Sequence, residues 1–199
     1  MTSFSQSGED LIIKKAFDEL GIKRPTYIDI GCHHPIFGNI TYLFYKNNSK
    51  GIVVEPNNKF FEIIKQKRNK DICINSGVGN HDGEENYYSF KRDTRNTFSK
   101  QQADEWKKQS GQDYEINKIK IYSLNSIINK FLDNKIPDLI SLDTEGYEEV
   151  ILSTFDWNYK PKIFCIESAG RKDALNTLFI SKGYLVYAET PANTIFKLK

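Results

Sequence analysis

Two acids that follow apolar segments have the spacing of a nucleoside-binding site. Glu55 comes directly after the apolar run GIVV at 51–54. Asp29 lies inside the apolar run YIDI at 27–30, which Gly31 terminates. Glu55 follows Gly31 by 24 positions, close to the roughly 20 residues that separate the glycine turn from a ribose-binding acid in βαβ units. The pattern predicts a nucleoside site, although Gly31 could simply permit a turn and Glu55 could cap a helix.

The turn after the first apolar segment selects among nucleoside cofactors. It reads DIGCHHP, so His33, His34 and Pro35 stand where a dinucleotide fingerprint has its later glycines. A diphosphate must approach bare backbone at a helix N-terminus, and it fits this turn poorly. S-adenosylmethionine (SAM) offers an ammonium group to acids near the turn and ribose hydroxyls to Glu55. The sequence therefore favours SAM as the cofactor.

Further acids occur where two later apolar segments end. Asp143 follows 138–142, and Glu167 follows 162–166. Ligands of open α/β sheets bind at the carboxyl ends of the strands, so Asp143 is a candidate base for a substrate hydroxyl. With Glu167 or a histidine it could also hold a divalent ion, and oxygen ligands favour magnesium or manganese. Alternatively, Asp143 caps the following helix.

His33 and His34 lie in the turn that is expected to face the same edge of the sheet. Either imidazole could act as a base near neutral pH, or it could hydrogen-bond the loop and fix its shape. Both histidines are candidate catalytic residues.

The apolar pattern predicts the elements that position these residues. Continuous apolar strands separated by amphipathic helices are typical of a mostly parallel sheet. The closing segments YLVYAE and TIFKLK, joined by a tight turn, predict a hairpin, so that the sheet ends in an antiparallel edge strand. The expected helices are 9–21, a helix of about three turns after Gly31, 57–69, 124–132, a helix ending near 155, and 171–182; the expected strands are 27–30, 51–54, 71–75, 84–90, 119–122, 138–142 and 162–166, with a loop at 76–79.

Residues 91–118 interrupt the alternation of expected strands and helices. They are rich in Gln and Lys, with isolated Phe98 and Trp106. The segment is either a linker or disordered loop, or a lid over the substrate, because long insertions often carry function. Trp106 favours the lid.

Composition excludes several classes of protein. The 199 residues suffice for one domain. A net charge of +2 is too small to indicate a basic surface that binds nucleic acid. No apolar run approaches the roughly 20 residues that span a bilayer, and the N-terminus lacks the pattern of a secretory signal. The three cysteines lack metal-ligand spacing. Reduced thiols in a cytoplasmic protein are expected.

Taken as a set, the motifs resemble those of the FkbM-type SAM-dependent methyltransferases. They are SQSGED, YIDIGCHHP, GIVVEPN, SGVGNHDG, and LISLDTEGYEEVIL followed by CIES. The resemblance covers nearly the whole chain in the expected order and leaves out only 91–118. It implies a class I methyltransferase fold, α/β with seven strands in one domain, and transfer of a methyl group from SAM to a hydroxyl of a saccharide or secondary metabolite.

The resemblance also implies roles for individual residues. Asp29 and Gly31 would line the methionine end of SAM, and Glu55, with Pro56 beside it, would hold the ribose. The residues implied to flank the adenine are Ser76, Gly77 and Val78, and those implied to fold over the cofactor from the N-terminus are Gln6 and Asp10. His33-His34-Pro35 departs from the small residues of many members, which bears on specificity.

Two other functions compete with this interpretation. A nicotinamide-dependent sugar oxidoreductase is disfavoured by the missing glycines and the terminal hairpin. A non-catalytic module that binds a nucleoside or sugar shares the same expected fold. For the enzyme, a small molecule, a nucleotide-sugar or a glycan is the expected acceptor.

Overall fold

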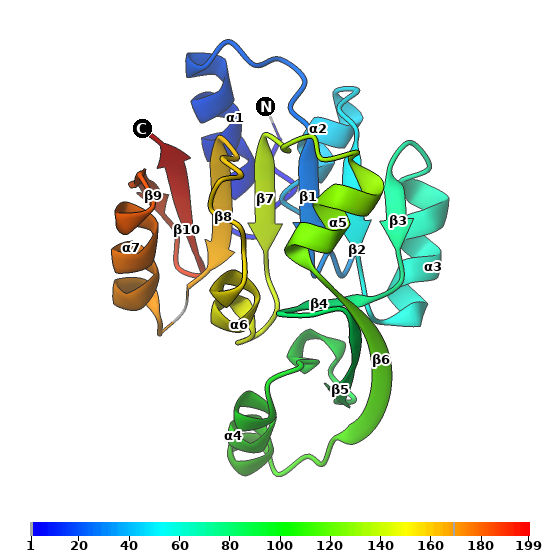
Figure 1. The fold of residues 1–199 in the computed structure, drawn as a ribbon. Helices are drawn as coiled ribbons and strands as arrows, with labels where there is room; N and C mark the ends of the chain where they lie inside the picture. Colours follow the sequence, from blue (N-terminus) through cyan, green and yellow to red (C-terminus); the bar gives the residue numbers. More distant parts are fainter. Residues whose placement is uncertain (1, 169) are drawn as a thin grey trace.

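A seven-stranded sheet forms the centre of the protein, in the order β3-β2-β1-β7-β8-β10-β9 (Figure 1). The computed structural model describes residues 2–168 and 170–199. The pairs from β3 to β8 are parallel, while β10 is antiparallel to both β8 and β9. The strands are β1 (Tyr27–Ile30), β2 (Gly51–Val54), β3 (Ile72–Ile74), β7 (Leu139–Leu142), β8 (Ile163–Glu167), β9 (Tyr184–Glu189) and β10 (Asn193–Leu198).

The predicted fold class is therefore confirmed, including the hairpin at one edge of the sheet. One detail differs from the expectation. The strand that runs against the others is β10, second from the edge, and the edge itself is β9. After β8 and α7 the chain forms β9 at the edge of the sheet. It then turns back, and β10 fills the space between β9 and β8.

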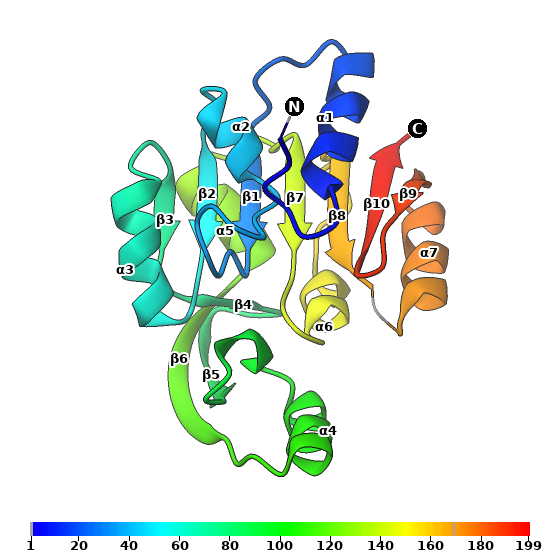
Figure 2. The ribbon, with the colours of Figure 1, turned by 180° about the vertical axis from the view of Figure 1, so that it is seen from behind.

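Helices cover both faces of the sheet. One face carries α1 (Glu9–Glu19), α2 (Tyr42–Lys46) and α3 (Asn58–Lys67), seen in front in Figure 2. The opposite face carries α5 (Leu124–Phe131), α6 (Glu148–Ser153) and α7 (Lys172–Ser181), seen in front in Figure 1. None of the helices that the structure describes is long and apolar enough to cross a bilayer.

Alternation along the strands divides the core between these two helical layers. In β1, Ile28 and Ile30 pack with α5, α6 and α7, whereas Tyr27 packs with α1, α2 and α3. Successive side chains of a strand point to opposite faces, so both faces need apolar residues. This double burial is the reason that the strands appear in the sequence as continuous apolar runs.

The expected helix of about three turns between β1 and β2 is wrong, because α2 contains only five residues. The preceding residues form a loop in which His33 (φ 52°) and Gly38 (φ 68°) adopt left-handed conformations. The side-chain oxygen of Asn39 accepts hydrogen bonds from the backbone amides of Thr41 (3.1 Å) and Tyr42 (2.7 Å). The helix therefore begins only after Asn39, which satisfies its first free amides.

A second, three-stranded sheet has the order β4-β6-β5. It comprises β4 (Gly77–Gly79), β5 (Gly83–Ser89) and β6 (Glu115–Ser123). The expectation of a loop at 76–79 is corrected in part, since β4 pairs with β6 in parallel. In Figure 1 the arrowheads of β7 and β8 point toward this small sheet, which lies beyond the carboxyl ends of the main strands.

The segment 91–118 is neither a bare linker nor a disordered loop. It contains the 3-10 turn η1 (Asp93–Arg95), the helix α4 (Lys100–Ser110) and the start of β6. Ala103 of α4 is fully buried against Tyr88 and Phe90 of the β5 region, and Trp106 packs against the same cluster. Apolar contacts thus hold α4 beside the small sheet.

Candidate active site

A cavity of about 550 Å³ lies at the carboxyl ends of the main strands, a volume that suits a small-molecule ligand. Its wall is formed on one side by the ends of β1, β2 and β7. The segment 91–118, called the inserted segment below, also contributes to the wall. The residues expected from the sequence that line it are Gln6, Gly31, His33, Glu55, Pro56, Ser76, Gly77, Val78 and Asp143. The expected residues Asp10, Asp29, His34 and Glu167 do not line this cavity.

Glu55 is held in the cavity wall by backbone amides. One carboxylate oxygen accepts a hydrogen bond from the amide of His33 and the other from the amide of Asn57, both at 2.8 Å. Burial raises the pKa of Glu55 to about 7. A carboxylate has about four lone-pair sites, so two acceptor positions remain for ligand hydroxyls.

Gly31 and Asp143 bring the ends of β1 and β7 into close contact. The amide of Asp143 donates to the carbonyl of Ile30 at 3.1 Å. Gly31 adopts φ 77°, and a Cβ there would lie 1.8 Å from the main-chain oxygen of Asp143. Only glycine fits both the left-handed conformation and this approach. The predicted turn glycine is thus part of the wall.

Carboxyl groups gather beside this contact. One oxygen from each of Asp143, Glu145 and Glu167 lies within 4.8 Å of the others. Burial, followed by the neighbouring acids, raises the pKa of all three carboxyls. Arg171 pairs with Glu167 at 3.5 Å and with the buried Glu148 at 2.9 Å. Because burial and mutual repulsion disfavour the charged forms of these carboxyls, a bound cation would stabilise those forms.

Glu145 is the member of this cluster that sequence reasoning did not select. Its φ of 54° is unusual for a residue other than glycine, and such strain concentrates at functional sites. Its carbonyl accepts a hydrogen bond of 2.8 Å from the hydroxyl of Thr97, in the inserted segment. In the sequence Glu145 lies three positions after the apolar segment 138–142, where it could equally complement the dipole of the next helix. The neighbouring Gly146 has φ 95°.

Ser76, Gly77 and Val78 form another part of the wall. Ser76 is fully buried, and its hydroxyl has no hydrogen-bond partner in the described part of the chain. A Cβ on Gly77 would lie 2.2 Å from the ring of Phe98, so that ring packs directly over the glycine. The wall here therefore contains a buried hydroxyl whose hydrogen-bonding capacity is unused.

The two histidines have different surroundings. His33 lines the cavity and packs against Phe60, with ring centroids 3.9 Å apart and the rings tilted by 43°. Burial lowers its pKa. Its Nε2 is buried without a partner among the residues described. His34 instead accepts hydrogen bonds at Nδ1 from the amides of Ile36 (3.2 Å) and Phe37 (3.0 Å). These contacts fit the alternative role, in which His34 fixes the shape of the loop, and its catalytic role stays a prediction.

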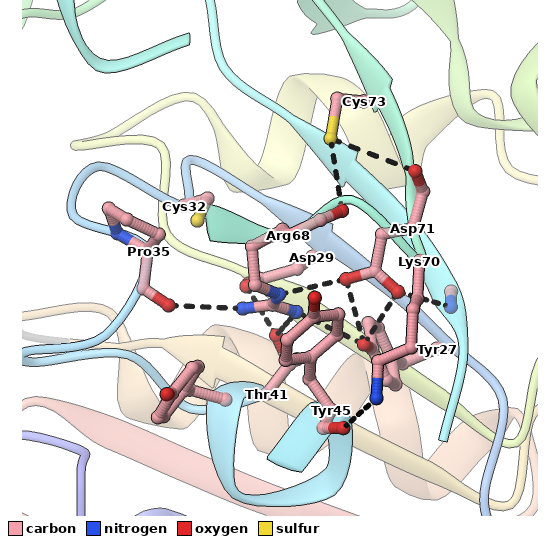
Figure 3. Close-up of polar contacts among 12 residues, drawn as sticks. Tyr27, Asp29, Cys32, Pro35, Thr41, Tyr45, Arg68, Lys70, Asp71 and Cys73 are labelled. Carbon is pink, nitrogen blue, oxygen red and sulfur yellow. Dashed lines mark hydrogen bonds and ion pairs between the residues drawn. The ribbon is translucent and has the colours of Figure 1, made fainter. Parts of the chain in front are cut away.

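Asp29 lies beneath the site rather than in its wall. Alternation along β1 directs its carboxylate to the α1–α3 face, where it accepts hydrogen bonds from Asn39 (3.0 Å) and Thr41 (2.7 Å). The fully buried Arg68 also bonds to Thr41 (2.9 Å) and pairs with Asp71 (2.8 Å), as Figure 3 shows. This polar network holds the loop between β1 and α2.

Asp10 holds the N-terminal segment. Its buried carboxylate accepts hydrogen bonds from the hydroxyl of Ser3 (2.6 Å), the amide of Phe4 (2.7 Å) and the hydroxyl of Ser5 (2.9 Å). These contacts fold the segment against the loop after β1, and Gln6 reaches the cavity wall. Asp10 itself is not in the cavity wall, and the expectation that Gln6 and Asp10 fold over the cofactor stays a prediction.

The inserted segment forms a further part of the cavity wall, and the sequence did not indicate most of the residues that contribute to it. Its members in the wall are Arg92, Asp93, Thr94, Arg95, Asn96, Thr97, Phe98 and Trp106. Only Trp106 and Phe98 stood out in the sequence, as aromatic residues in a polar stretch. The arginines gave no signal, because nothing in their spacing distinguishes them from surface charge.

The strand order and the cavity at the carboxyl ends define the class I SAM-dependent methyltransferase fold. A Pyrococcus horikoshii protein assigned as an RNA methyltransferase is similar in structure, with a TM-score of 0.50, 9% identity, and coverage of 98% of this chain and 89% of its own. A TehB-like SAM-dependent methyltransferase from Corynebacterium glutamicum gives 0.47, with 13% identity and coverage of 97% and 88%. Precorrin-6y C5,15-methyltransferase from Geobacter metallireducens gives 0.46, with 10% identity and coverage of 94% and 86%.

The family follows from the sequence comparison. Residues 29–184 match the methyltransferase FkbM domain, and the chain belongs to this family. It is a SAM-dependent methyltransferase. Comparison with curated protein sequences gave no match.

Proposed function

We propose that the protein transfers the methyl group of SAM to a hydroxyl of a saccharide or secondary metabolite. The observation that carries this proposal is the place of Asp143, a carboxyl in the cavity wall between the expected cofactor residues and the inserted segment. Acceptors of this class include small molecules, nucleotide-sugars and glycans. A nicotinamide-dependent oxidoreductase and a non-catalytic binding module are the alternatives to be tested.

Several described residues suit SAM. The two free acceptor positions on Glu55 suit the ribose hydroxyls, and the unpaired hydroxyl of Ser76 suits a polar edge of the adenine. The carboxyl group of Glu145, which lines the cavity, suits the ammonium group of SAM. Gln6 and Gly31 would then border the methionine end.

Bound SAM supplies a methyl carbon that is activated by a positively charged sulfur. In this proposal Asp143 would accept the proton that the acceptor hydroxyl loses during the transfer. Its raised pKa brings it closer to neutrality than an exposed aspartate, where a general base is most effective. His33, which is also in the wall, is the second candidate for this proton.

We further propose that the whole chain acts as one domain in which 91–118 serves as a substrate lid. Two features support this role. The segment contributes η1 and Trp106 to the cavity wall, and Thr97 hydrogen-bonds to the backbone of Glu145. Closure of such a segment would exclude water from the reacting groups.

A divalent ion is a second proposal for the same cluster. The ion expected at Asp143 and Glu167 would gain a third oxygen ligand from Glu145. Three carboxylates suit magnesium or manganese. Calorimetric titration with each metal, and methyl transfer measured with and without a chelator, test this proposal. Activity that survives the chelator together with no heat of binding would contradict it.

The three cysteines support a reducing compartment, and we propose the cytoplasm. Cys32, Cys73 and Cys165 are free thiols. Burial raises the pKa of each, which keeps the thiols protonated and unreactive.

Thermal unfolding with SAM, S-adenosylhomocysteine and NAD separates the three functions. Stabilisation by SAM and S-adenosylhomocysteine, followed by turnover on a hydroxylated acceptor, is the expected result. Stabilisation by NAD alone would replace the proposal with the oxidoreductase. SAM binding without turnover across nucleotide-sugars, free glycans and hydroxylated metabolites would favour the binding module.

A further inference from the structure

We propose that Arg92 and Arg95 form an anion-binding subsite in the acceptor half of the cavity. On this basis the acceptor carries a phosphate or carboxylate group in addition to its reactive hydroxyl. The proposal rests on the proposed function and narrows its substrate class.

The two arginines lie one 3-10 turn apart. The amide of Arg95 donates to the carbonyl of Arg92 at 3.0 Å, which closes the turn that includes η1. Side chains three residues apart in a 3-10 turn lie one above the other. Both arginines line the cavity, so one short turn contributes two cationic residues to its wall.

Neither guanidinium group forms an ion pair with the residues that the structure describes. The acid between them, Asp93, pairs with Lys59 at 2.8 Å, so its charge is already matched. Nε of Arg92 donates to the hydroxyl of Thr94 at 3.1 Å. The charge of Arg95 opposes the rise in the pKa of Glu145 that burial causes, but the two side chains form no ion pair, so the other guanidinium N–H donors of this turn remain available to a ligand.

The arginines are assigned to the acceptor by the segment that carries them, although Asp93 between them lies near enough to His33 and Glu55 that its charge acts, beside the larger effect of burial, to raise the pKa of each. Arg92 and Arg95 come from the inserted segment, as do Phe98 and Trp106, which add aromatic surface to the wall. The expected cofactor residues come instead from the ends of the main strands and the start of β4. A guanidinium group binds phosphate or carboxylate through paired N–H donors, and two such groups suit an acidic sugar or a phosphorylated metabolite.

The carboxylate of SAM is the competing ligand for these arginines. The two assignments differ in what the arginines control. If they hold the acceptor, their loss leaves the affinity for S-adenosylhomocysteine unchanged. If they hold the cofactor, that affinity falls.

The direct test follows the arginine Nε–H signals by ¹⁵N NMR as inorganic phosphate is added to the full chain with S-adenosylhomocysteine. We expect saturable shifts with a Kd of about 1 mM or tighter. The double variant Arg92→Gln/Arg95→Gln should bind phosphate at least about tenfold more weakly, a change of about 1.4 kcal/mol. Lys91→Gln is the matched control, because Lys91 is exposed in the same segment and does not line the cavity.

A second set of probes identifies the anion. Glucose, glucose 6-phosphate and glucuronate share one ring and differ in charge. Tighter binding of glucose 6-phosphate alone identifies phosphate, and tighter binding of glucuronate alone identifies carboxylate; either supports the subsite, as does a preference for both. Equal binding of all three sugars would overturn it.

Two further outcomes would also overturn the proposal. One is a phosphate response that does not saturate or that persists in the double variant. The other is a loss of S-adenosylhomocysteine affinity of about tenfold or more in the double variant, which would assign the arginines to the cofactor. If the unaltered protein binds neither SAM nor S-adenosylhomocysteine, the proposed function fails, while phosphate binding is still decided by the NMR titration.

Discussion

A Cβ on Gly31 would lie 1.8 Å from the main-chain oxygen of Asp143. This contact joins the end of β1 to the end of β7 at the point where the expected cofactor residues meet the candidate base. The backbone of one residue therefore sets the position of the other.

The contact predicts the effect of Gly31→Ala. The substitution adds both the clash and the left-handed strain at φ 77°, so we expect loss of SAM binding and a large drop in stability. Gly21→Ala is the control, because Gly21 has φ 72° and open space around its Cβ position. It should show only the strain, about 1–2 kcal/mol. Equal losses in urea unfolding and calorimetry for the two variants would contradict the role of the contact.

Asp143→Asn tests the proton acceptor. We expect methyl transfer to fall by about 10²-fold or more while SAM affinity, measured by calorimetry, is kept within a fewfold. Glu149→Gln is the control, since Glu149 lies exposed in the first turn of α6. Unchanged turnover in the Asp143 variant would remove this residue from the mechanism and leave His33 as the candidate.

Glu55→Ala tests the cofactor half of the cavity. Hydrogen bonds to a charged group contribute about 1.5–3 kcal/mol, so SAM affinity should fall roughly 10- to 100-fold. Glu62→Ala, on the exposed side of α3, should leave the affinity unchanged. Calorimetry that gives the same affinity for all three proteins would show that Glu55 does not hold the ribose.

The pKa of Glu55 predicts how stability depends on pH without ligand. Burial raises this pKa from 4.5 to about 7, so the folded protein holds a proton that the unfolded chain releases between these values. The free energy of unfolding should therefore fall as the pH rises through this window, by about 3 kcal/mol at most, and level off above it. Urea unfolding of Glu55→Gln should show a shallower fall. Parallel pH profiles for the two proteins would refute the assignment.

Arg68→Met tests the network beneath the site. Arg68 is fully buried and pairs with Asp71, and removal of one partner of a buried ion pair costs about 3–5 kcal/mol. Lys67→Met, on the exposed surface of the same helix, should change stability little. A comparable melting temperature for both variants would mean that the network contributes little to folding.

Much of the fold was predictable, because parallel strands buried on both faces leave continuous apolar runs in the sequence. β1, β2, β7 and β8 were located in this way, as was the terminal hairpin. The short α2 was missed, since the left-handed His33 and the capping side chain of Asn39 override the pattern of the segment. The inserted segment was left unresolved, because α4 buries little beyond Ala103 and so lacks an apolar stripe.

The site was predictable to the extent that the carboxyl ends of strands mark it. Glu55 and Asp143 line the cavity for that reason. Asp29 was misplaced, because its position inside β1 directs the side chain by alternation to the other face. Glu145 also follows a strand end, but the sequence did not separate a place in the carboxyl cluster from a role at the helix N-terminus. The two arginines depend on loop geometry and on contacts between distant segments, which local sequence patterns do not encode.

The hydrogen bond between the Thr97 hydroxyl and the Glu145 carbonyl has a consequence for engineering. α4 and the small sheet share an apolar cluster of their own. This part of the protein could therefore be exchanged to redirect the enzyme to other acceptors. A replacement insert must also provide a donor to that carbonyl. Without one, the exchange would disturb the reacting carboxyls along with the specificity it was meant to change.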